Sequence, residues 1–150
     1  MTEPRWELRP ATASDRDFLF ELHRATMRPY VEPIFGWNDT KQAELFDEAF
    51  TPANCQVIQI GGEDAGVLEV AETAEEIWLT LIELDPRWQG AGVGTSVVSS
   101  VLHRGAETRR PVGLRVLRTN SAARALYERL GFVAFCETDE RIYLRADPPA

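Results

Sequence analysis

The residues IWLTLIELDPRWQGAGVGTSVV, numbered 77–98, decide the fold of this chain. Residues 77–84 form an apolar run typical of a buried strand, and the valines after the glycines recur on one helical face. Between them Gly90, Gly92 and Gly94 alternate with other residues, although glycine carries an entropic cost in ordered structure. A strand that leads through a glycine turn into a helix predicts an anion site, because the helix N-terminus presents free N–H groups and the positive end of its dipole.

Three binding turns share this layout. A nucleotide P-loop needs a lysine after its last glycine, whereas Thr95 follows Gly94 directly. A dinucleotide-binding turn needs GxGxxG and an acidic residue about 20 positions later, where this chain has Arg109 and Arg110. The third pattern, Q/R-x-x-G-x-G/A, is matched by residues 89–94. The sequence of the turn therefore fits the third pattern best.

A second motif follows one predicted strand later. Residues 120–132 read NSAARALYERLGF. Together with the turn, they resemble the N-x-x-A-R-x-L-Y-E-x-x-GF segment of the GNAT superfamily of acetyl-CoA-dependent N-acetyltransferases. The close match covers about residues 77–132. The resemblance implies the GNAT fold, an α/β (α+β) fold with a mixed, mostly antiparallel sheet of six to seven strands and about four helices. One such domain is expected over residues 1–150.

Periodicity elsewhere agrees with this order of elements. Strands are expected at 6–9, 55–60, 65–72, 111–118, 132–137 and 141–146, with a hairpin turn at 61–64. Ser14 is the expected N-cap of a helix that fades before Pro29, because residues 28–39 contain two prolines and a glycine and predict a loop or broken helix. A second helix is expected up to Pro52, and Gly131 should end the one that begins near Ser121.

Composition limits the partners. The chain has a net charge of −8, which disfavours nucleic acid and membrane surfaces as partners. It has no apolar run of the roughly 18 residues that a membrane span needs, and no N-terminal signal is recognisable, so a cytoplasmic location is expected. Cys55 and Cys136 are too few and too far apart for a zinc site or a disulfide framework, and both are expected to be buried, inert thiols. No metal is expected.

The resemblance implies acetyl-CoA as the co-substrate and assigns residues to it. Main-chain N–H groups of the turn would wrap the pyrophosphate, and the strand before it would splay from its neighbour to receive the pantetheine and polarise the thioester carbonyl. Arg87 and Arg124 are the nearest arginines in sequence, and Asn120 could equally cap its helix. The cofactor-binding residues expected are Ile82, Leu84, Gln89, Gly90, Ala91, Gly92, Val93, Gly94, Thr95, Asn120 and Arg124.

Two residues are expected to move protons. Tyr127 is the candidate general acid, because a phenol with a pKa of about 10 is protonated at neutral pH. Its alternative is a helix aromatic that packs on the sheet. Glu83 is the candidate general base, with Glu69 and Glu72 as rivals, and the base could also act through water.

The acceptor site is expected in the segment between the first two helices, at Tyr30, Glu32 and Trp37. His23 and His103 have no partner at metal spacing, so surface or packing roles are expected for both. The predicted reaction is transfer of an acetyl group to a primary amine of a small molecule, peptide or protein through a ternary complex, by a monomer or homodimer. Alternatives are a non-catalytic acyl-CoA-binding module, a dinucleotide-binding enzyme, or an enzyme for a longer acyl-CoA.

Overall fold

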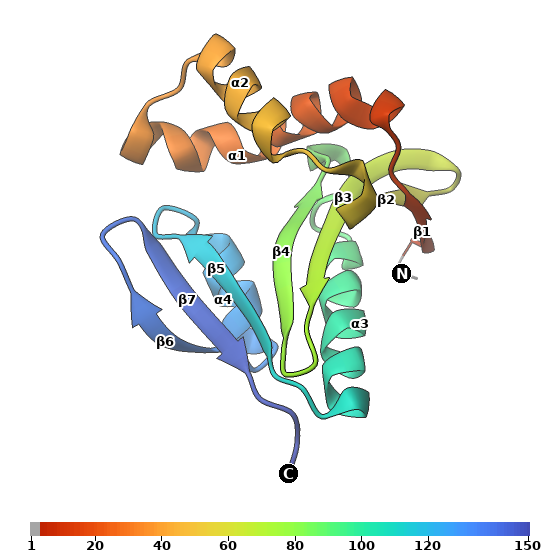
Figure 1. Ribbon diagram of the computed structural model, residues 1–150, viewed down its shortest axis with the longest axis vertical. Coiled ribbons are helices and arrows are strands. Elements are labelled where there is room, and N and C mark those ends of the chain that lie inside the picture. Colours follow the sequence, from red (N-terminus) through yellow and green to blue (C-terminus); the bar gives the residue numbers. More distant parts are fainter. Residues whose placement is uncertain (1–3) are drawn as a thin grey trace. The chain divides into compact units, whose positions relative to one another are not determined.

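The computed structural model describes residues 4–150, which form a mixed sheet with four α-helices (Figure 1). The hydrogen-bonded strand order is β1-β2-β3-β4-β5-β7-β6. This confirms the expected fold class. The elements are β1 (Trp6–Pro10), η1 (Ala13–Asp15), α1 (Arg16–Phe35), α2 (Asp39–Ala49), η2 (Pro52–Asn54), β2 (Cys55–Ile60), β3 (Glu63–Glu72), β4 (Ile77–Leu84), η3 (Pro86–Trp88), α3 (Val93–Thr108), β5 (Val112–Leu117), α4 (Ser121–Arg129), β6 (Val133–Glu137) and β7 (Arg141–Ala146).

The chain forms two compact units. The N-terminal unit comprises Met1–Glu69 and Leu81–Val93, and the C-terminal unit comprises Val70–Thr80 and Gly94–Ala150. Each unit is described separately below.

In the N-terminal unit, β2 pairs antiparallel with both β1 and β3. The predicted hairpin between β2 and β3 is confirmed, and its two-residue turn places Gly61 and Gly62 at φ of 59° and 82°. Its core includes Val57 and Val67 from the strands and Leu19 from α1. Helices α1 and α2 lie side by side (Figure 1), with the rings of Phe20 and Phe46 5.5 Å apart.

Helix α1 differs from the sequence prediction at both ends. Its entry is set by Thr12 and Asp15, which form a capping box around η1, and not by Ser14. The helix continues through Pro29 and Pro33 to Phe35, so the prediction of a loop at this point was wrong. Both prolines are exposed and lie four residues apart, hence on one solvent-facing side. Water can therefore solvate the carbonyls that lose their N–H partners there.

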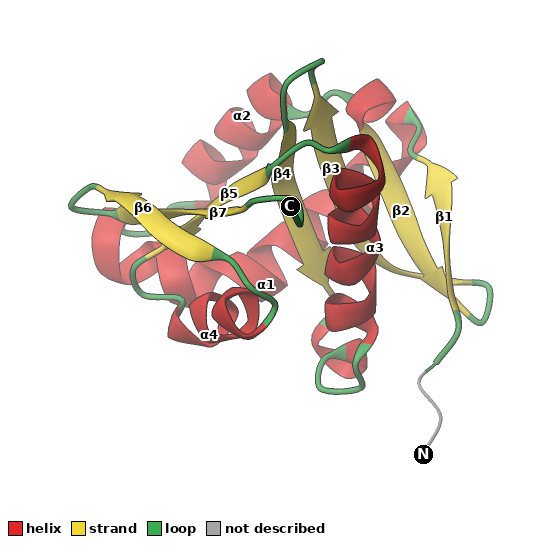
Figure 2. Ribbon diagram, turned by 90° about the horizontal axis from the view of Figure 1, so that it is seen from below, coloured by secondary structure: helices red, strands yellow, loops and turns green. Residues whose placement is uncertain are grey.

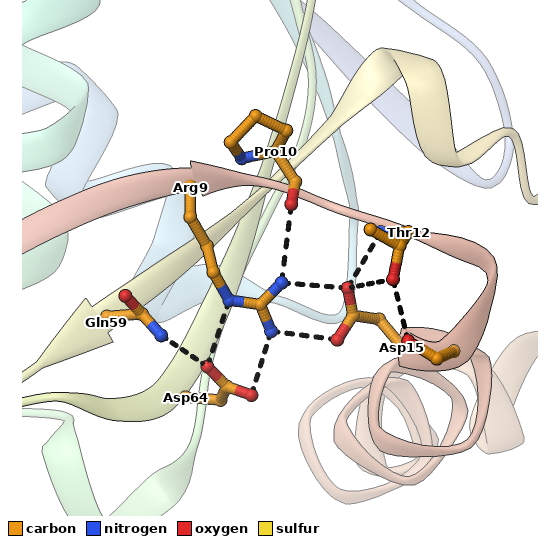
Figure 3. A network of polar contacts seen from close by, with 7 residues as sticks. Arg9, Pro10, Thr12, Asp15, Gln59 and Asp64 are labelled. Carbon is orange, nitrogen blue, oxygen red and sulfur yellow. Dashed lines mark hydrogen bonds and ion pairs between the residues drawn. The ribbon is translucent and has the colours of Figure 1, made fainter.

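An arginine connects β1 to the start of α1 (Figure 3). Arg9 donates to both carboxylate oxygens of Asp15, at 2.9 and 2.8 Å, and to Oδ2 of Asp64 at 2.9 Å. These hydrogen bonds are the main cause that lowers the pKa of Asp15 and of Asp64 below the ordinary aspartate value. Asp15 also accepts from the N–H of Thr12 at 2.8 Å, so the same carboxylate caps the helix entry.

In the C-terminal unit, β4 and β5 are parallel and β7 pairs antiparallel with both β5 and β6. Figure 2 shows α4 along one face of the β5, β7 and β6 strands. Helix α3 approaches β5 closely at Gly105, where an added Cβ would lie 2.8 Å from Val112. Gly131, with φ of 102°, follows α4, which confirms it as the predicted stop.

The two cysteines differ. Cys55 is buried in β2, as expected, and burial raises the pKa of its thiol to about 12, which disfavours the reactive thiolate. Cys136 is exposed, and the expectation of burial was wrong. Its strand β6 lies at the edge of the sheet and is mostly exposed, so an apolar sequence there does not imply a core position.

Candidate active site

The glycine turn follows directly from β4. Asp85 fixes its start, because its side chain accepts from the N–H of Arg87 at 2.9 Å while its own N–H donates to the carbonyl of Ala65 at 2.8 Å. Gly90 and Gly92 have φ of 79° and 89°, in the left-handed region that glycine adopts without strain. Such residues at alternate positions can direct successive N–H groups toward one anion.

Helix α3 continues the turn. It begins at Val93, whose side chain is fully buried and anchors the junction. The first N–H groups of a helix have no partner within the helix, so those of Val93, Gly94 and Thr95 are the natural donors to a bound phosphate. An added Cβ at Gly90 or Gly94 would meet nothing within 4 Å, so both positions lie open.

Gln89 organises this turn. Its side-chain Nε2 donates to the carbonyl oxygen of Leu84 at 2.8 Å, which ties the turn back to the end of β4. Its own main-chain N–H donates to Pro86 at 3.3 Å. The donors available to an anion therefore begin at Gly90, and Gln89 serves chiefly to hold the turn in place.

The pairing of β4 with β5 is short. Within the C-terminal unit, the partners are Ile77 with Val112 and Trp78 with Gly113. Strand β5 continues to pair with β7 as far as Leu117, whereas Leu79 and Thr80 have no β5 partner within this unit. The splay that the sequence resemblance implies for β4 stays a prediction.

Glu83 carries a buried carboxylate in the N-terminal unit. Its side chain is 2% exposed, and Oε2 lies 2.8 Å from Nδ1 of His23 on α1. The centroid of the imidazole lies 6.1 Å from that of the Trp37 ring and 6.0 Å from that of the Phe46 ring. Behind Glu83, strand β3 comes so close that a Cβ on Gly66 would overlap the Glu83 carbonyl oxygen.

The His23–Glu83 pair was missed at the sequence level. The two residues lie 60 positions apart on a helix and a strand, and no local motif links them. The one available signal was a histidine on the inward side of α1, next to Leu22, in a chain with only two histidines.

The rival carboxylates have other partners. Glu69 accepts from the Cys55 thiol at 3.5 Å. Glu72 binds Arg104 at 2.9 Å and Arg110 at 2.7 Å. Burial tends to raise the pKa of Glu72, but the two arginines together outweigh it and lower the pKa. Glu83 is thus the one of the three that is both deeply buried and paired with a titratable base.

Tyr127 and Asn120 lie on α4 in the C-terminal unit. Asn120 is confirmed as the N-cap, since its Oδ1 accepts from the N–H of Ala123 at 3.2 Å. Tyr127 is 8% exposed and meets Phe132 edge-on at 5.6 Å, so a packing role is present. Burial raises the pKa of Tyr127 to about 12, which keeps the phenol protonated at neutral pH. Arg124 pairs with Glu128 at 3.3 Å.

The candidate acceptor residues lie at the end of α1 and just after it. Glu32 accepts from Arg28 at 2.9 Å, and the guanidinium of Arg28 lies 5.9 Å from the Trp37 ring. The indole N–H of Trp37 donates to Asp39 at 2.8 Å. Glu32 and Trp37 are thus brought together around one cation, and Tyr30 is half-buried on the same helix. Their binding role stays a prediction.

Two structural features are absent from residues 4–150. In this part of the chain, no group of three or more His, Cys, Asp or Glu side chains could hold a metal ion. No helix there has the length and apolar character needed to cross a membrane.

Comparison with known proteins places these features in context. The profile of the Acetyltransferase (GNAT) family matches residues 16–132. The solved structure of PaiA N-acetyltransferase from Thermoplasma acidophilum, in complex with coenzyme A, is similar with a TM-score of 0.77 at 14% identity, over 95% of this chain and 99% of that one. The ribosomal-protein-S18-alanine N-acetyltransferase from Escherichia coli gives a TM-score of 0.67 at 20% identity, over 97% and 96%. A search of curated proteins finds no significant match.

Proposed function

The chain belongs to the Acetyltransferase (GNAT) family and is an acyltransferase, and we propose that it moves an acetyl group from acetyl-CoA directly to a primary amine of a small molecule, peptide or protein through a ternary complex. The observation that carries this proposal is the turn after β4, where left-handed glycines lead into the N-terminus of α3. A pyrophosphate is an anion that such a turn suits. The coenzyme A complex of the similar protein from T. acidophilum supports the same donor.

Acetyl-CoA is proposed to bind mainly to main-chain groups. The N–H groups from Gly90 to Thr95 hold the pyrophosphate, while Gln89 fixes the turn. The main chain at Ile82 and Leu84 binds the pantetheine and polarises the thioester carbonyl. One well-aimed donor of this kind contributes roughly 3 kcal/mol in a site without water. Asn120 and Arg124 supply further polar contacts.

The chemistry then requires two proton transfers. The amine attacks the thioester carbonyl, a tetrahedral intermediate forms, and the carbon–sulfur bond breaks. Tyr127, whose phenol is protonated at neutral pH, gives its proton to the leaving sulfur. The amine loses its proton to a base at the His23–Glu83 pair.

The acceptor is assigned to the region of Tyr30, Glu32 and Trp37. The net charge of −8 attracts cationic amines over a distance and so raises their local concentration. Charge of this kind steers cationic amines in general toward the protein and does not identify the acceptor.

Two glycines provide a matched test of the donor site. Gly90 in the turn and Gly62 in the hairpin have nearly equal φ, 79° and 82°, and an added Cβ would meet nothing at either. Substitution by alanine should therefore strain both backbones by about 1–2 kcal/mol. Gly90→Ala is expected to weaken coenzyme A binding, measured by calorimetry, while Gly62→Ala binds normally. Equal affinities in the two variants would contradict the assignment.

Turnover separates the proposed enzyme from its alternatives. Consumption of acetyl-CoA should be measured against spermidine, lysine ethyl ester and peptides with a free N-terminus. Coenzyme A binding without turnover on any amine would favour a binding module. Thermal stabilisation by NAD(P) but not by coenzyme A would favour a dinucleotide enzyme instead.

A further inference from the structure

The Glu83 carboxylate is enclosed. At 2% exposure it has almost no surface through which an ammonium from solvent could reach it, and a carboxylate buried to this degree needs a hydrogen-bonded partner. That partner is His23, whose side chain is 24% exposed and which lies in the same unit. The solvent-facing end of the pair is therefore the imidazole.

The hydrogen bond also orients the ring. Oε2 of Glu83 lies 2.8 Å from Nδ1. A carboxylate in its ionised form can only accept, and Nδ1 is then the donor that carries the proton. In the neutral ring this leaves the lone pair on Nε2. The rings of Trp37 and Phe46 are its aromatic neighbours, with centroids about 6 Å from that of the imidazole.

From this geometry we infer that His23 is the catalytic base and that Glu83 is its positioning residue. The inference rests on the proposed acetyl transfer and deepens it. It assigns the contact with the amine to Nε2 of His23, and it gives the buried carboxylate the task of orienting the ring and balancing the charge that forms on it.

Two arginines on the same helix as His23 already have partners. On α1, Arg24 binds Glu21 at 2.6 Å, and it also lies 3.6 Å from Asp39. Arg16 binds Asp47 of α2 at 2.7 Å. The charge that balances an imidazolium at this position is therefore that of Glu83.

The proton balance is complete with these groups. Nε2 of His23 takes one proton from the ammonium R–NH₃⁺, which gives a neutral amine and an imidazolium paired with the Glu83 carboxylate. The amine nitrogen bonds to the acetyl carbon and the carbon–sulfur bond breaks. Tyr127 protonates the sulfur and regains a proton from the amide nitrogen. The imidazolium then releases its proton to water, so each turnover yields amide, free coenzyme A and one proton.

Two kinds of acceptor separate a base from a structural residue. An alkylamine such as spermidine is protonated at neutral pH and must lose a proton before it attacks, whereas hydroxylamine is already uncharged. His23→Gln keeps a side-chain N–H that can donate to Glu83 but has no basic nitrogen. It should lower kcat/KM for spermidine, or for a peptide amine, by about 10²–10⁴-fold, with much less effect on hydroxylamine. A structural defect would lower both equally.

Controls keep the test decisive. His103→Gln changes an exposed histidine on α3 and should leave turnover unchanged. Added imidazole should partly restore His23→Ala and should not stimulate the native protein. Glu83→Gln should lose less activity than His23→Gln. If Glu83→Gln loses more activity and His23→Gln keeps its turnover, His23 is not the base. The proposed acetyl transfer would still stand. A native protein that binds coenzyme A but acetylates no amine would overturn the proposed function as well.

Discussion

Tyr127 and the His23–Glu83 pair are both proposed to act in proton transfer, yet their surroundings are built differently. Tyr127 lies within a continuous motif, between the capping Asn120 and its ring contact Phe132. Glu83 owes its setting to a helix 60 residues earlier in the chain, which contributes His23. The comparison teaches that a local motif can specify the candidate acid, whereas the setting of the candidate base depends on how distant elements pack.

The largest expected effect tests the acid. Tyr127→Phe keeps the ring and its edge contact with Phe132, so stability and coenzyme A affinity should change little. Loss of the phenol proton should lower kcat by about 10²–10⁴-fold. Steady-state turnover and calorimetry with coenzyme A measure the two quantities. An unchanged kcat would mean that Tyr127 only packs in the core. The His23–Glu83 pair would then be the one remaining candidate for proton transfer among the groups compared.

The same contrast explains what the sequence could predict. Strand and helix positions followed from periodicity, and the turn at 89–94 and the motif at 120–132 identified the family, because both are local. The end of helix α1 was predicted wrongly, because a proline inside a helix usually breaks it. The sequence does not show that Pro29 and Pro33 face water, where their effect is tolerated. Exposure of Cys136 depends on the edge position of β6, which is a property of strand order. The partner of Glu83 could not be predicted either, because it depends on the packing of a helix 60 residues earlier in the chain.

Helix α1 carries His23, and Arg9 holds the start of this helix through Asp15. The position of the candidate base therefore depends on Arg9. Arg9→Met removes both hydrogen bonds to Asp15, whose side chain is only 10% exposed, and should lower the free energy of unfolding by about 3 kcal/mol. Arg118→Met breaks an exposed pair with Glu137 and should cost less than about 1 kcal/mol. Urea denaturation of both variants measures the difference. Equal losses would mean that Arg9 does not anchor α1.

The anchor also predicts how stability depends on pH. Hydrogen bonds from Arg9 lower the pKa of Asp15 and Asp64 in the folded state. Their stabilising contribution is therefore complete above the unfolded pKa of about 4 and is lost as the pH falls through the lower folded values. Arg9→Met should flatten this acid dependence. Denaturation midpoints between neutral pH and pH 3 test it, and parallel curves for the native protein and the variant would contradict it.

The smallest effect concerns the anchor of α4. Asn120→Ala should lower the free energy of unfolding by about 1 kcal/mol, because the N–H of Ala123 loses its capping oxygen. Asn120→Ser supplies another capping oxygen and should retain stability. If the Asn120 amide also binds coenzyme A, the serine variant should bind it about 3–10-fold more weakly, the effect of one neutral hydrogen bond. Normal coenzyme A affinity in Asn120→Ser would mean that Asn120 serves only as the helix cap. The start of α4 would then position Tyr127 but would not itself contact coenzyme A.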